Sequence, residues 1–392
     1  MNNLDEPPSD SNIQGIDCGH SREPQRGYLS PAQQPITWWG ILTRLTLCAA
    51  VALSLYALIV GLLINPYILR GSSAGRVVGV YEGYDSILRH RHEVKDTNTI
   101  VLFWGSSMVR EGVDCAQLES DVAAVSAYNL AVSGDIPCRR LVELPRVQAL
   151  HPQMVIIGVS YPEVFEDRLP FEDQISALPA SAYEELSPAA REILPERLNQ
   201  LANRPEWERF LWKRRFFLSA VFSTMGVEGR GDQLRPGHST EFKAPWVYQQ
   251  GIKTEELQRF LTLRKNVYPP YTSGPQSEPS STLAARSLTV LVRGLEQQGC
   301  EVTLVNMPLH PMLNEVVPGE RRAALNRFLA TLRSEQVTVL DYQDKLPAAS
   351  FVDFVHMNSE GRTAFTRSMA ELLVSRPMSA RTKHFTQADR AL

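Results

Sequence analysis

The stretch TIVLFWGSSMVREGVD, residues 99–114, decides which fold class the sequence favours. Five apolar residues, Ile100 to Trp104, run directly into the turn Gly105-Ser106-Ser107, and polar residues compatible with a helix follow. A tight strand-to-helix turn favours a residue without a Cβ atom, which is a packing reason for the glycine. A serine at the carboxyl end of a central strand is also exposed to a ligand crevice, which is a chemical reason for the serine. The turn alone fits both readings.

The same alternation of short apolar and amphipathic segments continues along the chain. It predicts further strands at residues 126–134, 153–160 and 337–342, a strand that leads into a loop at residues 300–311, and helices at residues 138–151, 281–299, 319–336 and 359–375. Strands that alternate with helices of this length are typical of βαβ units. We therefore expect an α/β fold with a doubly wound, mainly parallel sheet.

The composition excludes some classes of protein. An apolar content of 43% in 392 residues is ordinary for a globular protein and argues against disorder of the whole chain. A formal charge of −3, without a basic stripe, gives no reason to expect a nucleic-acid partner. The length accommodates two average domains or one large α/β domain with an insertion.

An uncharged stretch near the N-terminus predicts a membrane anchor. Residues 45–69 carry no charged side chain, and a helix needs about 20 apolar residues to cross a bilayer. Trp38 and Trp39 precede the stretch and Tyr67 follows it, as interfacial aromatic residues do. We expect one transmembrane helix at residues 39–66, hence a single-pass membrane protein. Basic residues occur on both sides of the helix, so charge leaves its orientation open.

The regions around the alternating pattern differ in composition. Residues 1–36 are polar and predict a disordered tail, and residues 70–98 are assigned to a connector. The alternation is interrupted at residues 163–280, which are rich in proline and in charged helical pieces. We expect an inserted helical cap there, lying over the strand ends of a domain at residues 99–375. Residues 376–392 are expected to be loosely ordered.

A second motif with chemical potential lies near the C-terminus. The segment FVDFVHMNSEG contains Asp353, His356, Asn358 and Gly361. A carboxylate three residues before a histidine can orient its imidazole, and such a histidine is a ready general base for a serine elsewhere. Asn358 is placed to cap the helix that follows.

Together these segments resemble the SGNH (GDSL-like) hydrolase superfamily, whose short sequence blocks occur in a fixed order along a flavodoxin-like sheet. The first block corresponds to Gly105-Ser106-Ser107, the second to Gly134 in NLAVSGD, and the third to IIGVSYPE, where Ser160 replaces the usual Asn. The last block is Asp353 and His356 with the Asn and Gly that follow them. The resemblance covers about residues 99–162 and 281–375.

The resemblance implies a role for each of these residues. Ser107 would be the nucleophile, His356 its general base and Asp353 the residue that orients His356. The backbone N–H groups of Ser107 and Gly134 would form an oxyanion hole, with the Ser160 hydroxyl as a third donor. Two positions depart from the family pattern: Ser106 stands in place of Asp, and Ser160 in place of Asn.

The anchor and the Gly-Ser-Ser turn are most similar to the membrane-attached SGNH proteins of teichoic-acid D-alanylation and exopolysaccharide O-acetylation. This similarity implies a catalytic domain outside the cytoplasm. It also implies an acylated glycan or ester as substrate and a multi-pass membrane acyltransferase as a possible partner.

The remaining candidates carry weaker signals. Five cysteines lack metal-ligand spacing, and Cys115 and Cys138 are either a disulfide of an extracytoplasmic domain or buried free thiols. His310 ends a predicted strand, and His90 and His92 have no accompanying carboxylate or cysteine cluster. We expect no metal and no cofactor.

The sequence therefore predicts acyl-ester chemistry through a Ser107–His356–Asp353 triad and an acyl-enzyme intermediate. Water as acceptor would make the protein an esterase, and a glycan hydroxyl would make it an O-acyltransferase. The alternative is a non-catalytic SGNH-fold protein that binds or scaffolds within a membrane acyltransferase complex.

Overall fold

The computed structural model of the chain describes residues 38–63, 73–165, 181–194 and 281–376, and the single positions 178, 200 and 255. The predicted polar tail at residues 1–36, most of the predicted cap at residues 163–280 and the tail after residue 376 lie outside the described residues. The chain divides into two compact units, residues 1–57 and 58–392.

The first unit contains most of helix α1 (Trp38–Leu63). Its 26 residues exceed the number that a helix needs to cross a bilayer. Every side chain described in it, including Trp38 and Trp39, is exposed. By length and composition, its segment Trp38–Tyr56 is able to span a membrane, in agreement with the predicted anchor.

The second unit is built on a five-stranded parallel sheet with the strand order β2-β1-β3-β4-β5. Its strands are β1 (Thr99–Trp104), β2 (Val125–Asn129), β3 (Met154–Val159), β4 (Glu301–Asn306) and β5 (Val337–Asp341). The α/β class and the parallel sheet are thus confirmed.

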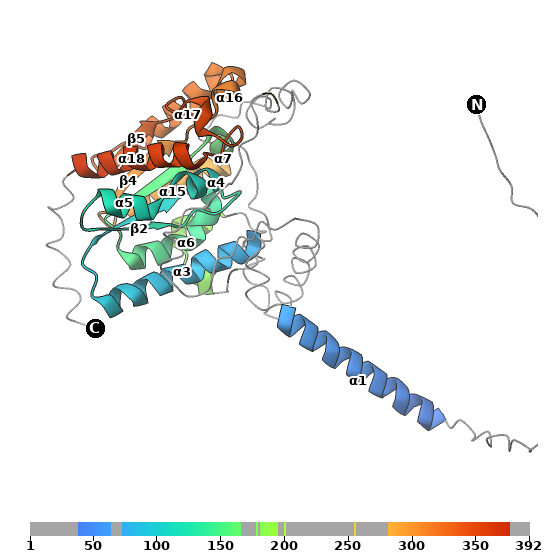
Figure 1. Ribbon diagram of the computed structural model, residues 1–392. Coiled ribbons are helices and arrows are strands. Elements are labelled where there is room, and N and C mark those ends of the chain that lie inside the picture. Colours follow the sequence, from blue (N-terminus) through green and yellow to red (C-terminus); the bar gives the residue numbers. More distant parts are fainter. Residues whose placement is uncertain are drawn as a thin grey trace, which may run out of the picture. The chain divides into compact units, whose positions relative to one another are not determined.

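Helices cover both faces of this sheet (Figure 1). The first face is covered by α6 (Pro137–Leu150), α15 (Leu283–Glu296) and α17 (Gly319–Thr331). The second face is covered by α4 (Ser107–Gly112), α5 (Cys115–Asp121), α16 (Pro311–Val316) and α18 (Ser359–Ser375). Side chains alternate between the faces, so that Leu102 and Trp104 of β1 belong to the first core and Val101 and Phe103 to the second.

The strand order places a crevice beside the Gly-Ser-Ser turn. The chain leaves β1 towards β2 on one side and returns through α6 to β3 on the other. In open α/β sheets, ligands bind at such a reversal, outside the carboxyl ends of the strands. Here those ends are Trp104 of β1 and Val159 of β3, so the turn after β1 lies where a ligand is expected.

The segment assigned to a connector, residues 70–98, is instead largely a helix of the domain. Helix α3 (Ser73–Val94) packs against α6. Its buried residues lie at helical spacing in the core of the first face: Val77, Val80, Tyr81, Tyr84 and Ile87. The prediction missed this helix because glycine and charged residues interrupt the apolar pattern.

The described part of the predicted insertion is helical, and the rest of the predicted cap lies outside the described residues. It comprises α7 (Tyr161–Phe165), α9 (Ser181–Glu184) and α10 (Pro188–Ile193). Helix α9 contacts α6 and α10 contacts α15, so these two helices extend the helical layer of the first face. They do not form a cover over the strand ends.

The described cysteines form no disulfide with one another. Cys115, Cys138 and Cys300 are buried thiols. Burial raises the pKa of Cys138 and of Cys300 to about 12, so both thiols stay protonated near neutral pH. Of the two alternatives for Cys115 and Cys138, the structure contains the buried thiols and not the disulfide.

Candidate active site

The turn after β1 presents Ser107 at the start of α4. Gly105 has a φ of +150°, and a Cβ atom there would lie 2.4 Å from Val109 Cγ2 and 2.9 Å from the Gly158 carbonyl oxygen. Ser106 is buried and caps α4, since its hydroxyl accepts a hydrogen bond from Met108 N–H at 3.4 Å. Ser107 is only partly buried. The glycine therefore serves packing, and the second serine is the one left accessible.

A short loop between β5 and α18 supplies the histidine and the aspartate. The Val352 N–H bonds to the His356 carbonyl oxygen at 2.9 Å, and Phe351 forms an antiparallel bridge with Met357. Asp353 Oδ1 accepts hydrogen bonds from the N–H groups of Val355 and His356 at 2.9 and 2.8 Å. The loop thus holds the carboxylate and the imidazole in a fixed relation.

Three residues predicted from the sequence meet in one hydrogen-bonded chain. His356 Nε2 lies 2.8 Å from Ser107 Oγ, across 249 residues of sequence. His356 Nδ1 lies 2.7 Å from Asp353 Oδ2. This is the arrangement of nucleophile, base and orienting carboxylate that activates a serine.

The electrostatic environment suits a general base. Burial alone would lower the pKa of His356, but the hydrogen bond and charge of Asp353, followed by the charge of Glu111, raise it. Burial would raise the pKa of Asp353, but the hydrogen bond and charge of His356 and two backbone N–H donors lower it. Asp353 therefore remains ionised, and proton transfer from Ser107 to His356 is favoured.

The residues after His356 anchor the loop. Asn358 caps α18 by accepting the Gly361 N–H at 3.0 Å and donates to the Ala349 carbonyl oxygen at 2.6 Å. A Cβ atom on Gly361 would lie 2.1 Å from the Ser350 carbonyl oxygen, so only glycine fits this close approach. The Asn and Gly of the last sequence block therefore have structural roles.

Two residues to which sequence reasoning gave no role connect α4 to its surroundings. Asn129, at the end of β2, donates its Nδ2 to the carbonyl oxygens of Val109, Arg110 and Val113 at 3.1–3.3 Å. Glu111 is buried, and its Oε2 lies 3.8 Å from His356 Nε2. The polar end of a strand marks Asn129 as a candidate, whereas no local pattern distinguishes Glu111 from other helix glutamates.

The two other predicted oxyanion residues have different surroundings. Gly134 lies in a turn with a φ of +67°, and the Val132 N–H before it bonds to the Gly105 carbonyl oxygen at 3.0 Å. This bond brings the Gly134 turn alongside the Ser107 turn. Ser160 is buried, and its N–H bonds to Glu163 Oε2 at 2.7 Å.

Glu163 also forms a hydrogen bond with the Ser160 hydroxyl. Burial raises the pKa of Glu163 to about 7, and hydrogen bonds with the Ser106 and Ser160 side chains partly offset the rise. The Ser160 hydroxyl thus has a partner in the carboxyl group of Glu163. This partner competes with the predicted use of Ser160 as a third oxyanion donor.

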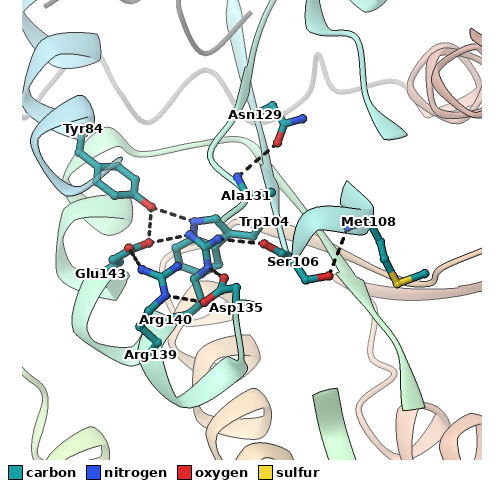
Figure 2. Close-up of polar contacts among 11 residues, drawn as sticks. Tyr84, Trp104, Ser106, Met108, Asn129, Ala131, Asp135, Arg139, Arg140 and Glu143 are labelled. Atoms are coloured by element: carbon teal, nitrogen blue, oxygen red, sulfur yellow. Dashed lines mark hydrogen bonds and ion pairs between the residues drawn. The ribbon is translucent and has the colours of Figure 1, made fainter. Parts of the chain in front are cut away.

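A network of buried charges lies behind the Gly105 turn (Figure 2). It joins Asp135 and Glu143 to Arg139 and Arg140 through four ion pairs, and all four side chains are at most 3% exposed. Arg140 also donates to the Gly105 carbonyl oxygen at 3.1 Å. Because Asp135 follows Gly134, the network fixes the second turn relative to the first.

Two neutral side chains complete this network. The Tyr84 hydroxyl donates to Glu143 Oε2 at 3.0 Å and accepts from Trp104 Nε1 at 2.8 Å. The charges of Arg139 and Arg140 outweigh the effect of burial and lower the pKa of Glu143. The network therefore links α3, β1 and α6 through ionised, hydrogen-bonded groups.

The histidines set aside in the sequence have ordinary surroundings. His310 is buried, caps α16 through its Nδ1 and packs edge-on against Phe351 and Phe354 of the His356 loop. His90 and His92 lie on α3. Within the described ranges, no group of His, Cys, Asp or Glu side chains is arranged to hold a metal ion.

Comparison with known proteins gives little guidance. A model of an uncharacterised protein family matches residues 249–377, which include Asp353 and His356 but not Ser107. No curated protein matches the chain. The function is therefore argued from the geometry of the site.

Proposed function

We propose that this chain is a membrane-anchored serine esterase or O-acyltransferase of the SGNH type, with a flavodoxin-like sheet. The observation that carries the proposal is the hydrogen-bonded chain Ser107 Oγ–His356 Nε2 and His356 Nδ1–Asp353 Oδ2, at 2.8 and 2.7 Å. The strand order supports it, because Ser107 follows β1 at the reversal of the sheet.

The first half-reaction forms an acyl-enzyme. Ser107 Oγ attacks the carbonyl carbon of an ester while His356 Nε2 takes the hydroxyl proton. The resulting oxyanion is bound by the N–H groups of Ser107 and Gly134. The tetrahedral species then collapses, the bond to the leaving alcohol breaks, and His356 returns the proton to that alcohol.

The second half-reaction transfers the acyl group. An acceptor O–H attacks the acyl-Ser107 carbonyl carbon, His356 takes its proton, and Ser107 Oγ leaves and recovers that proton. With water the product is a carboxylic acid, and with a glycan hydroxyl it is a new ester. The glycan acceptor, a membrane acyltransferase partner and an extracytoplasmic domain rest on the family resemblance and on helix α1.

A specific observation favours the alternative function. The N–H and the hydroxyl of Ser160 both bond to Glu163. The Ser160 hydroxyl therefore does not take over the role of the Asn side chain that is the third oxyanion donor of the family. Losing one such donor costs about 3–4 kcal/mol of transition-state stabilisation. A non-catalytic scaffold of a membrane acyltransferase complex would tolerate this loss.

Labelling with a fluorophosphonate probe separates the two functions. We would treat the full chain in detergent micelles and in native membranes, beside the variants Ser107→Ala, His356→Ala and Ser106→Ala. We expect labelling of the wild type and of Ser106→Ala, which removes the neighbouring cap and the hydrogen bond to Glu163 but no member of the triad, and loss of labelling in the other two. A wild-type chain that is unlabelled in both settings would support the scaffold. Release of alcohol from a p-nitrophenyl ester, compared with acyl transfer to an added oligosaccharide, would then distinguish esterase from transferase.

A further inference from the structure

A buried carboxyl group lies beside the reacting pair. Glu111 is four residues after Ser107 on α4, so both side chains lie on the same side of the helix. Glu111 is 1% exposed, and its Oε1 accepts a hydrogen bond from Arg110 at 3.0 Å. Its Oε2 is buried and has no hydrogen-bond partner within the described part of the chain.

This second oxygen is directed at the catalytic imidazole. Glu111 Oε2 is 3.8 Å from His356 Nε2, the same nitrogen that lies 2.8 Å from Ser107 Oγ. The opposite nitrogen, Nδ1, is bonded to Asp353. The imidazole therefore has a carboxyl group near each of its two nitrogens.

We propose that Glu111 is a positioning residue that holds the His356 imidazolium after Nε2 has taken the Ser107 proton. The inference deepens the proposed function and rests on it. Before the reaction, the Nε2 lone pair accepts the hydrogen bond of the Ser107 hydroxyl. Nε2 then carries no proton that it could donate to Glu111. After the attack, Nε2 carries a proton and the ring is cationic, and Glu111 Oε2 is the nearby acceptor without a donor.

The proton balance leaves Glu111 unchanged. The proton passes from Ser107 Oγ to His356 Nε2 and then to the leaving alcohol, and Glu111 takes none of it. A distance of 3.8 Å is too long for a hydrogen bond, and a movement of the ring by less than about 1 Å would form one. Glu111 thus offers a second site for the Nε2–H while the leaving group departs.

The surrounding charges favour this role. The charged groups that act on His356 are Asp353 on its own loop and Glu111 and Arg110 on α4. The charged groups that act on Glu111 include His356, Arg110 and Asp353. Arg362 of α18 is a further one, since its guanidinium is coupled to the Glu111 charge and donates to the Glu111 backbone carbonyl oxygen at 2.8 Å. Burial raises the pKa of Glu111, and the charges of His356 and Arg110 oppose the rise. The carboxyl group is therefore most readily ionised when the ring is cationic.

A titration of His356 tests the pairing without relying on activity. The full chain in micelles is labelled with ¹³C at the histidine ring, and the spectrum of His356→Gln identifies the signal of His356. We expect Glu111→Gln to lower the pKa of His356 by about 1 unit, because an anion within about 4–6 Å favours the cationic ring. The matched control is Glu119→Gln on α5, whose carboxylate bonds to the Ala127 N–H at 2.8 Å and does not act on His356. An unchanged or raised pKa in Glu111→Gln overturns the inference.

The pH dependence of probe labelling supplies the second measurement. We expect the acid limb of the Ser107 labelling rate to move to lower pH in Glu111→Gln, and the maximal rate to fall about 10-fold. If Glu111→Gln does not fold, Glu111→Asp keeps the charge but withdraws it by one methylene, and a smaller shift of the same sign is expected. An absence of any shift in Glu111→Asp would then count against the inference. If the pKa of His356 shifts in Glu111→Gln but the probe does not label the wild type, only the proposed function is rejected. If the probe labels the wild type but the pKa of His356 does not shift, only the role of Glu111 is rejected.

Discussion

The protein contains two clusters of buried charge that differ in their access to solvent. The network of Asp135, Arg139, Arg140 and Glu143 is at most 3% exposed and pairs two acidic with two basic groups. In the triad, the side chains of His356 and Asp353 are 18% and 22% exposed, and Ser107 is partly exposed. The closed cluster fixes the turns that precede Ser107 and Asp135, whereas the open cluster is arranged so that its protons can move. Under the proposed function, similar polar chemistry therefore serves architecture in one cluster and reaction in the other.

The largest effect on activity that tests this contrast is expected from Asp353→Asn. An amide at this position selects the wrong imidazole tautomer and does not compensate the imidazolium, so we expect kcat for ester hydrolysis to fall about 10³–10⁴-fold. The melting temperature should change little, because the group is partly exposed. Steady-state kinetics and thermal unfolding of the same sample check both halves. A large loss of stability would mean that the open cluster is also architectural.

The closed cluster should respond in the opposite way. Arg139→Met leaves Asp135 and Glu143 with Arg140 as their remaining cation of the network, and breaking a buried ion pair costs about 3–5 kcal/mol of unfolding free energy. We expect the folded protein to keep kcat within a few-fold, since the hydrogen bond to the Gly105 carbonyl oxygen comes from Arg140, which the variant retains. Denaturant unfolding and kinetics measure the two quantities. A folded variant of normal stability with greatly reduced kcat would remove the distinction between the clusters.

Asn129 lies between the two cases, because it bonds to carbonyl oxygens in and just after α4, the helix that begins at Ser107. Asn129→Ala removes three hydrogen bonds to backbone carbonyl oxygens, and we expect the unfolding free energy to fall by about 1–3 kcal/mol. A fall in kcat of about 10-fold should accompany it, because a small displacement of the nucleophile reduces the rate. Asn129→Asp retains the acceptor for the Ala131 N–H and loses the donor, so it should behave like the alanine variant. Wild-type behaviour of the aspartate variant would contradict this role of Asn129.

The smallest effect is expected from Glu163→Gln and concerns pH. Because the pKa of Glu163 is raised to about 7, the folded state retains a proton that an unfolded carboxyl group loses at lower pH. Stability from this group is therefore lost as pH rises from about 4.5 to about 7. We expect the fall in melting temperature between pH 5 and pH 8 to be smaller in Glu163→Gln than in the wild type. Glu184→Gln, at an exposed position, controls for the loss of a charge, and an equal fall in all three proteins would contradict the prediction.

Much of the fold follows from local patterns. The apolar runs that predicted strands overlap β1 to β5, and the predicted helix at residues 281–299 contains α15 (Leu283–Glu296). Helix α3 was missed although Val77, Val80 and Tyr84 recur at helical spacing, because Gly79, Gly83 and several charged residues weaken the pattern. For α9 and α10, periodicity indicates helices but not the face of the sheet against which they pack.

The residues of the candidate site likewise fall into those that the sequence identifies and those that it does not. Ser107, Asp353 and His356 are recognisable because each belongs to a short block whose glycine or asparagine has a local structural reason. Glu111 and the engagement of Ser160 by Glu163 are not recognisable, since they depend on burial and on a distance to a particular partner. The protonation of a carboxyl group is set by its surroundings, and those surroundings come from several segments.

The sequence alone determined the α/β class, an apolar helix long enough for a membrane and the identity of three residues able to form a triad. Each of these is expressed locally, in a periodicity of two or of 3.6 residues or in a short block with a turn. The tertiary structure decided that Ser107 and His356 meet across 249 residues, that Ser160 is bonded to Glu163 and that Glu111 lies against the imidazole. These contacts arise only when the sheet brings the carboxyl ends of its strands to one edge and the helices of both faces close around them.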